Sequence, residues 1–208
     1  MKLFWAVVLN FIFIFCSIFS GGVVLSGFGK GSIWRYEWVG MIFISLLGGL
    51  LHFTFELSGF NPVVGMFSAV NESVWEHLKL GFWPALLYTL IEYRQIRKQT
   101  NNFWAAKTVV PYTIIAVIVA IFYTYTSFTG ESIFIIDITS FFVAVIIGQI
   151  LSYKLLTYTK LAKWTQTLAM ALFIILGILF IVFTFYPPEL PPFQDPISGE
   201  YGIIAHTH

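Results

Sequence analysis

Long apolar runs are the feature that most constrains this chain. Hydrophobic residues make up 58% of its 208 residues and charged residues only 10%, whereas about a quarter of the residues in a soluble domain are charged. Such a chain cannot cover a water-exposed surface, and runs of about 20 apolar residues can cross a bilayer as helices. The sequence predicts an all-α integral membrane bundle of six transmembrane helices, at residues 3–25, 39–60, 72–93, 108–128, 133–153 and 165–186.

Two further segments complete the predicted organisation. Residues 61–70 are apolar but too short to span, and Pro62 and Gly65 predict a re-entrant or interfacial turn before the third span. Residues 187–208 contain five prolines and predict a polar, extended and stiff extracytoplasmic tail. We therefore expect one six-helix transmembrane domain, residues 1–186, with the tail as a lid or rim over its outer mouth.

The first apolar run has an alternative interpretation as a signal peptide, because Lys2 precedes it. Its apolar core extends past the usual length of a signal-peptide core, and no clean small-x-small cleavage site follows. We therefore predict a helix that stays in the membrane. The single cysteine, Cys16, lies in this run and excludes both an internal disulfide and a cysteine-based zinc site.

The third predicted span carries unusual charge at its start. Residues 80–91 are an apolar run of 12 residues, which covers only about 18 Å of a hydrocarbon core of about 30 Å. The missing length must come from the charged turns before it, which places Glu76 and His77, with Glu72 one turn earlier, at or near membrane depth. Ionisable residues there indicate a functional site. Asn71 is the predicted N-cap of this helix.

The second predicted span presents small and polar residues on one side. That face contains Ser45, Gly48, Gly49, His52, Glu56 and Gly59. Small residues allow helices to approach closely in a bilayer. We therefore expect His52 and Glu56 to point into the bundle.

The histidine and glutamates of these two spans predict a metal site. His52 and Glu56 are four residues apart, and so are Glu72 and Glu76, so each pair can reach one point beside its helix. Imidazole and carboxylate ligands suit zinc, iron or manganese. The predicted metal ligands are His52, Glu56, Glu76 and His77, with Asp137, His206 or His208 as further candidates. Glu72 and Glu76 are the predicted catalytic residues, as general bases.

Three functions remain open from the sequence. The first is a metal-dependent hydrolase that acts on a lipid or lipid-linked substrate at the outer leaflet. The second is a structural or assembly protein, in which Glu72 only serves a helix cap, Glu76 pairs with Lys79, and His52 links helices by hydrogen bonds. The third is a proton- or cation-coupled transporter, although the polar path towards the cytoplasm is sparse.

The basic residues predict the orientation in the cell membrane. Nine of the eleven Lys and Arg residues fall in three alternate connections: Lys30, Arg35, Arg94, Arg97, Lys98, Lys107, Lys154, Lys160 and Lys163. The positive-inside rule places these connections in the cytoplasm and both termini outside. The net charge of +1 carries no information about nucleic acid, but the lack of a basic stripe with interleaved aromatic residues argues against it as a partner. The predicted partners are the lipid bilayer and a lipid or lipid-linked substrate.

The run NESVWEHLKL, residues 71–80, together with the tail residues 192–196 and 201–203, resembles a family of small bacterial integral membrane proteins of unknown function. The resemblance covers most of the chain and implies no activity. Alkaline ceramidases and related membrane hydrolases use a Ser, an Asp and a His-x-x-x-His on a late helix. This chain lacks that motif, and its sixth predicted span has no histidine.

Overall fold

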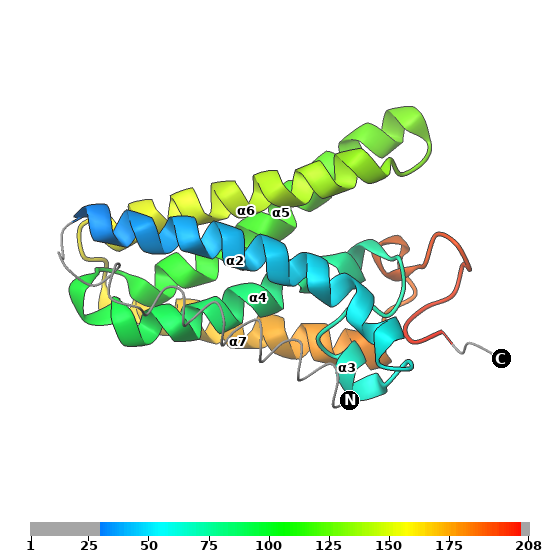
Figure 1. Ribbon diagram of the computed structural model, residues 1–208, viewed down its shortest axis with the longest axis horizontal. Helices are drawn as coiled ribbons and strands as arrows, with labels where there is room; N and C mark the ends of the chain where they lie inside the picture. Colours follow the sequence, from blue (N-terminus) through cyan, green and yellow to red (C-terminus); the bar gives the residue numbers. More distant parts are fainter. Residues whose placement is uncertain (1–29, 205–208) are drawn as a thin grey trace.

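The computed structural model describes residues 30–204, and the side chains of residues 33–204. Its helices are α2 (Lys30–Leu57), α3 (Pro62–Gly65), α4 (Val74–Gln95), α5 (Phe103–Thr129), α6 (Phe134–Thr157) and α7 (Lys163–Phe185), with 3-10 turns at Arg97–Gln99 and Pro191–Phe193. The described part of the chain contains no strand, only an isolated bridge between Gln194 and Tyr201. The predicted all-α class is therefore confirmed for these residues (Figure 1).

Four helices of the described chain are long and apolar enough to cross a membrane. They are Ile33–Leu57, Phe103–Thr129, Phe134–Thr157 and Lys163–Phe185, and they coincide with the second, fourth, fifth and sixth predicted spans. The chain is thus a membrane protein. The first predicted span, residues 3–25, lies outside the described residues.

The remaining long helix, α4, occupies the interior of the bundle. It has 22 residues, enough for about 33 Å, but its two glutamates, histidine, lysine and arginine keep it from being one of the four apolar candidates. It packs against α2, α5 and α7 (Figure 1). The third predicted span is therefore a helix of spanning length, and its Glu76, Lys79 and Glu92 side chains are buried.

The start of α2 corrects one prediction. The connection that carries Lys30 and Arg35 was predicted to extend to residue 38, before the second span, but α2 already begins at Lys30. Glu37 on this turn is completely buried and lies 2.6 Å from Lys107 Nζ. Lys107, predicted in a basic loop, is itself buried in the first turns of α5. A long-range ion pair thus makes a locally polar segment helical.

Close helix contact in the core depends on glycine. A Cβ atom built on Gly48 of α2 would lie 2.7 Å from the Leu80 carbonyl oxygen of α4, and one on Gly81 would lie 2.8 Å from Ile114 of α5. Around these positions, Phe43, Leu47 and Ile114 are almost fully buried. The small residues therefore set the spacing of the three central helices.

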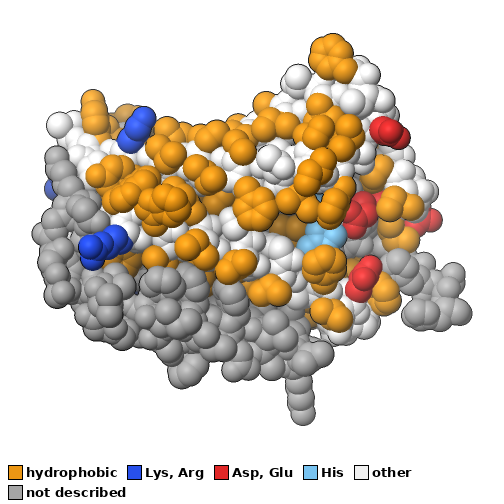
Figure 2. Space-filling model, turned by 45° about the horizontal axis from the view of Figure 1, so that its top comes forward, with side chains coloured by type: hydrophobic (Ala, Val, Ile, Leu, Met, Phe, Trp, Pro, Cys, Tyr) orange, Lys and Arg blue, Asp and Glu red, His pale blue; other side chains and the backbone are white. Residues whose placement is uncertain are grey.

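The two ends of the bundle differ in charge. The exposed basic side chains lie near the start of α2, at the end of α4 and around the α6–α7 connection. The exposed acids lie at the opposite end: Glu56, Glu72, Glu131, Glu189 and Glu200. Figure 2 shows this separation on one face, with a histidine surface at the acidic end. The positive-inside prediction places the acidic end outside.

The acidic end is closed by α3 and the C-terminal tail. Asn61 Oδ1 caps α3 by accepting a hydrogen bond from Val63 N, so the predicted re-entrant or interfacial segment is a short helix between turns. The tail was predicted to be extended, but it folds back: Gln194 pairs with Tyr201, and Phe193 packs against Trp75 of α4. This aromatic contact offsets the extended preference of the prolines.

Candidate metal centre

Three side chains from different segments meet at the acidic end of the bundle. His52 lies one turn before the end of α2, His77 lies in the first turn of α4, and Glu72 lies in the connection just before α4. The helix begins at Val74, and Ser73 is the N-cap, whose side chain accepts a hydrogen bond from Glu76 N. Asn71 is therefore not the N-cap. Because Glu72 precedes the helix, its side chain need not lie on the same helix face as Glu76.

The ligand atoms of these side chains form a compact triangle. His52 Nε2 lies 3.1 Å from His77 Nε2, and Glu72 Oε2 lies 3.9 Å from His52 Nε2 and 3.4 Å from His77 Nε2. A triangle with these sides has a centre about 2.0 Å from each corner, close to the bond length of zinc to histidine nitrogen or carboxylate oxygen. This group is the candidate metal centre.

The other nitrogen of His77 fixes the state of its ring. His77 Nδ1 lies 2.9 Å from the Ser73 carbonyl oxygen, which can only accept a hydrogen bond, so Nδ1 carries the proton. Nε2 then faces Glu72 and His52: in the protonated ring it donates a hydrogen bond to the Glu72 carboxylate, and in the neutral ring it offers a lone pair to a metal ion. A backbone carbonyl that orients a histidine in this way is typical of metal ligands.

The C-terminal tail holds Glu72 in place. Glu72 N donates a hydrogen bond to Asp195 Oδ1 over 3.2 Å, and neighbouring Asn71 donates to the Gly202 carbonyl oxygen over 2.8 Å. Asp195 is fixed in turn by the backbone and hydroxyl groups of Ser198. Sequence reasoning missed Asp195, since its contact with Glu72 joins residues 123 positions apart.

Hydrogen bonds favour the ionised forms of Glu72 and Asp195. The hydrogen bond with His77 lowers the pKa of Glu72 below its ordinary value, and this outweighs the opposing effect of burial. Burial would raise the pKa of Asp195, but the hydrogen bonds from Ser198 and from Glu72 N lower it overall. At neutral pH, Glu72 is therefore an anionic ligand beside two imidazole rings.

The centre is open on one side. The side chains of His52, His77 and Glu72 are 31%, 35% and 45% exposed, and a histidine surface is visible from outside in Figure 2. Three protein ligands with a further position open to water or substrate are typical of catalytic zinc sites, whereas structural zinc sites have four protein ligands.

The structure brings together only some of the predicted site residues. His52 and His77 meet, with Glu72 as the carboxylate. Glu76 instead faces the interior, where its Oε2 lies 2.5 Å from Lys79 Nζ and accepts a hydrogen bond from Val70 N. Glu56 is exposed one turn after His52 and does not belong to the group.

The remaining candidate ligands lie apart from the triangle. Asp137 Oδ1 accepts a hydrogen bond from Tyr125 Oη over 2.6 Å, although Asp137 is near enough to act electrostatically on His77. His206 and His208 lie outside the described residues. The signal that could have separated Glu72 from Glu76 is the sequence Ser-x-x-Glu at residues 73–76, a capping-box pattern that starts the helix after Glu72.

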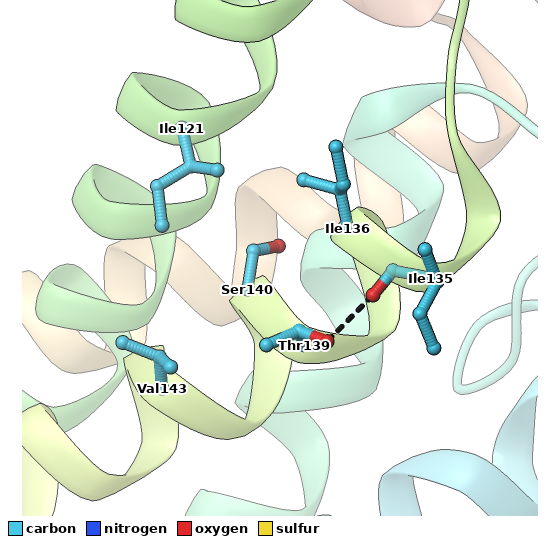
Figure 3. Close-up of a pocket in the computed structure, with 6 residues that line it drawn as sticks. All are labelled: Ile121, Ile135, Ile136, Thr139, Ser140 and Val143. Atoms are coloured by element: carbon cyan, nitrogen blue, oxygen red, sulfur yellow. Dashed lines mark hydrogen bonds between the residues drawn. The ribbon is translucent and has the colours of Figure 1, made fainter.

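An apolar cavity of about 230 Å³ lies beside Asp137, between α5 and α6. Its lining residues are Ile121, Ile135, Ile136, Thr139, Ser140 and Val143. Their polar atoms are already paired: Thr139 Oγ1 donates to the Ile135 carbonyl oxygen over 2.6 Å, as Figure 3 shows, and Ser140 Oγ donates to the Asp137 carbonyl oxygen. The cavity therefore suits an apolar chain rather than a polar ligand.

Comparison with known proteins gives one match. The model of a family of unknown function matches residues 28–203, which covers both ends of the bundle and the folded tail. No curated protein and no solved structure matches the chain. The match confirms the resemblance expected from residues 71–80 and the tail, and it brings no activity with it.

Proposed function

The chain belongs to this family, the family of unknown function DUF6512, and we propose from its site that it binds one divalent transition metal ion at His52, Glu72 and His77. Zinc is the first candidate, with iron and manganese as the alternatives. The observation that carries this proposal is the triangle of His52 Nε2, His77 Nε2 and Glu72 Oε2, with its centre at bonding distance from all three atoms.

The size of the triangle favours zinc over an octahedral ion. Ligands on one face of a zinc tetrahedron are about 3.3 Å apart, given bonds of about 2.0 Å. Ligands on one face of an octahedron with bonds of about 2.1 Å are about 3.0 Å apart. Two of the three distances, 3.4 and 3.9 Å, are nearer to the tetrahedral value, and the third is 3.1 Å.

Exposure argues against a purely structural role for this group. Buried ionisable groups cluster because each must find a partner, and Glu76 with Lys79 is such a case, since both are buried. His52, Glu72 and His77 are all partly exposed and have water as an alternative partner. Burial therefore does not explain why these three side chains converge. A metal ion bound by all three is the simpler explanation.

The proposed reaction is hydrolysis of a lipid or lipid-linked substrate. A bound zinc ion lowers the pKa of a coordinated water molecule to about 7 and so supplies a nucleophile. The open side of the site admits the scissile group, and the apolar cavity between α5 and α6 accommodates part of an acyl chain. Glu76 then serves the fold through Lys79 rather than acting as the general base.

Elemental analysis tests the metal directly. The full chain is purified in detergent without metal-affinity chromatography, and zinc, iron and manganese are measured in the wild type and in His52→Ala, Glu72→Gln and His77→Ala. We expect about one zinc ion per chain in the wild type and a strong loss in all three variants. Glu56→Gln is the matched control, because Glu56 is an exposed acid one turn from His52 and should keep the metal.

Two results would overturn the metal site. One is a wild type without metal that also fails to take up added Zn²⁺ at micromolar concentration. The other is metal that is retained in His52→Ala and His77→Ala but lost in Glu56→Gln. If zinc is bound, the zinc-loaded protein is mixed with phosphatidylethanolamine and phosphatidylglycerol micelles. Release of fatty acid or head group that disappears in His77→Ala supports hydrolysis of these lipids.

A further inference from the structure

A second cluster of ionisable groups lies at the opposite end of the bundle from the metal centre. Lys107 Nζ of α5 is 2.6 Å from Glu37 Oε1 of α2 and 2.6 Å from Glu92 Oε2 of α4. Ser152 of α6 completes the cluster, with its Oγ 3.1 Å from Lys107 Nζ and 3.2 Å from Glu37 Oε1. The four side chains thus join four helices at one point.

These groups have almost no contact with solvent. The side chains of Glu37, Glu92 and Lys107 are 0%, 1% and 2% exposed. Around them lie Tyr36, which is buried, and the Phe103 ring, whose centroid is 6.0 Å from Lys107 Nζ. Each charge in this place must be balanced, because water cannot solvate it.

The charges do not balance if both acids are ionised. Two carboxylates and one ammonium leave a net charge of −1 inside the bundle. No other cation of the described residues joins the cluster: Lys79 is engaged with Glu76 at the other end of α4, and the described arginines are exposed. One additional proton makes the cluster neutral.

The carboxyl groups of Glu37 and Glu92 are the groups that can take up that proton. Glu37 Oε2 and Glu92 Oε1 are buried and accept no hydrogen bond from a donor of the described residues. Glu37 Oε1 and Glu92 Oε2 both lie 2.6 Å from the same Lys107 Nζ, so the two carboxyl groups share one cation. A proton on either carboxyl group removes the uncompensated buried charge and leaves the other carboxylate paired with Lys107.

We propose that Glu37, Glu92 and Lys107 form a proton-binding site that holds one proton on one of the two carboxyl groups at neutral pH. The ammonium group of Lys107 contacts both carboxyl groups and balances the one negative charge that remains. Ser152 Oγ donates a hydrogen bond to Glu37 Oε1. Tyr88 Oη, which donates to the Tyr36 carbonyl oxygen, and Gln149 of α6, with its Oε1 unpaired, are the other polar groups near this junction. This site is separate from the metal centre and does not depend on it.

The number of buried protonated carboxyl groups tests the proposal. It is measured on the full chain in lipid vesicles by infrared spectroscopy, as the area of the carboxylic-acid carbonyl band that shifts in D₂O. We expect one such group in the wild type at neutral pH and none in Glu37→Gln or Glu92→Gln, because the remaining carboxylate pairs with Lys107 one to one. Lys107→Met should show two, since both acids then lack a cation.

Controls make the outcome decisive. Glu131→Gln removes an exposed acid and should leave the band unchanged. A wild type without the band overturns the proposal, because both acids are then ionised. A band that survives in both Glu37→Gln and Glu92→Gln overturns it as well, since the proton then belongs to another group. The wild-type measurement is decisive even where the Lys107→Met variant does not fold.

Discussion

The Nε2 atoms of His52 and His77 lie 3.1 Å apart and join two helices across 25 residues of sequence. Both rings are partly exposed, and His77 is oriented by the Ser73 carbonyl oxygen. Two imidazole nitrogens at this distance need a proton or a metal ion between their lone pairs. Glu72 Oε2 lies beside both nitrogens and adds a negative charge, which favours a metal ion at this position.

Removal of Asp195 tests how Glu72 is held. Asp195→Ala deletes the acceptor for Glu72 N and leaves the three proposed ligands in place, so we expect zinc affinity to fall about tenfold or more, as for other outer-shell partners. The measurement is competition for Zn²⁺ with a chromophoric chelator. Glu200→Ala, which removes an exposed acid from the same tail, should bind zinc like the wild type. Equal affinities for all three proteins would contradict a positioning role.

Zinc affinity should fall as the pH falls from about 7 to 5, because protons compete for histidine nitrogens with ordinary pKa values near 6.5. The hydrogen bond with His77 lowers the pKa of Glu72, so Glu72 stays ionised throughout this range. Glu72→Gln should therefore weaken binding without changing the pH slope, whereas His77→Ala should reduce the slope. A slope that vanishes in Glu72→Gln would assign the titration to the carboxylate instead.

The same lowered pKa has a consequence for folding. A depressed carboxyl pKa contributes stability that is present above the unfolded pKa and is lost as the pH falls through the folded value. For Glu72 that window lies below its ordinary value of 4.5. Metal-free wild type should thus lose this contribution only in strong acid, and Glu72→Gln should show a smaller change in thermal midpoint there.

The all-α class and four of the predicted spans could be predicted, because the apolar runs that a bilayer requires are visible in the sequence. The start of α2 could not be predicted, because its polar residues are typical of a loop. The ion pair that buries Glu37 is made with Lys107, 70 residues away in the sequence. The histidines of the site were predicted, but the carboxylate was not assigned as a ligand. That choice depends on helix α4 starting at Val74 and on a tail contact with Asp195 that no local pattern reveals.

The pair Glu76–Lys79 should act on stability rather than on metal binding. Both side chains are buried, and Lys79 Nζ also donates to the Gly65 carbonyl oxygen and to Thr184 Oγ1. Lys79→Met should destabilise the protein by about 3–5 kcal/mol, because it leaves a buried acid unpaired. The double variant Glu76→Gln/Lys79→Met should recover part of this loss. Thermal unfolding in detergent measures the relative stabilities of the wild type and the two variants. The zinc content of the folded variants should stay near the wild-type value.

Loss of zinc in the folded double variant would contradict this separation. Glu76 would then belong to the metal centre, as the spacing of Glu72 and Glu76 first suggested. Retained zinc together with lost hydrolysis would instead assign Glu76 to catalysis. The two measurements on one protein therefore separate the structural, ligand and general-base roles of this residue.

Neighbouring glycines in α2 give an internal test of the helix packing. A Cβ atom at Gly48 would meet the Leu80 carbonyl oxygen at 2.7 Å, whereas one at Gly49 would have no atom within 4 Å. Gly48→Ala should therefore destabilise the protein by about 1–3 kcal/mol through overpacking of α2 against α4. Gly49→Ala should be neutral or slightly stabilising, because alanine favours the helix. Thermal midpoints of the two variants in the same detergent provide the comparison, and equal midpoints would contradict the α2–α4 contact on which both the metal centre and the buried acid pair depend.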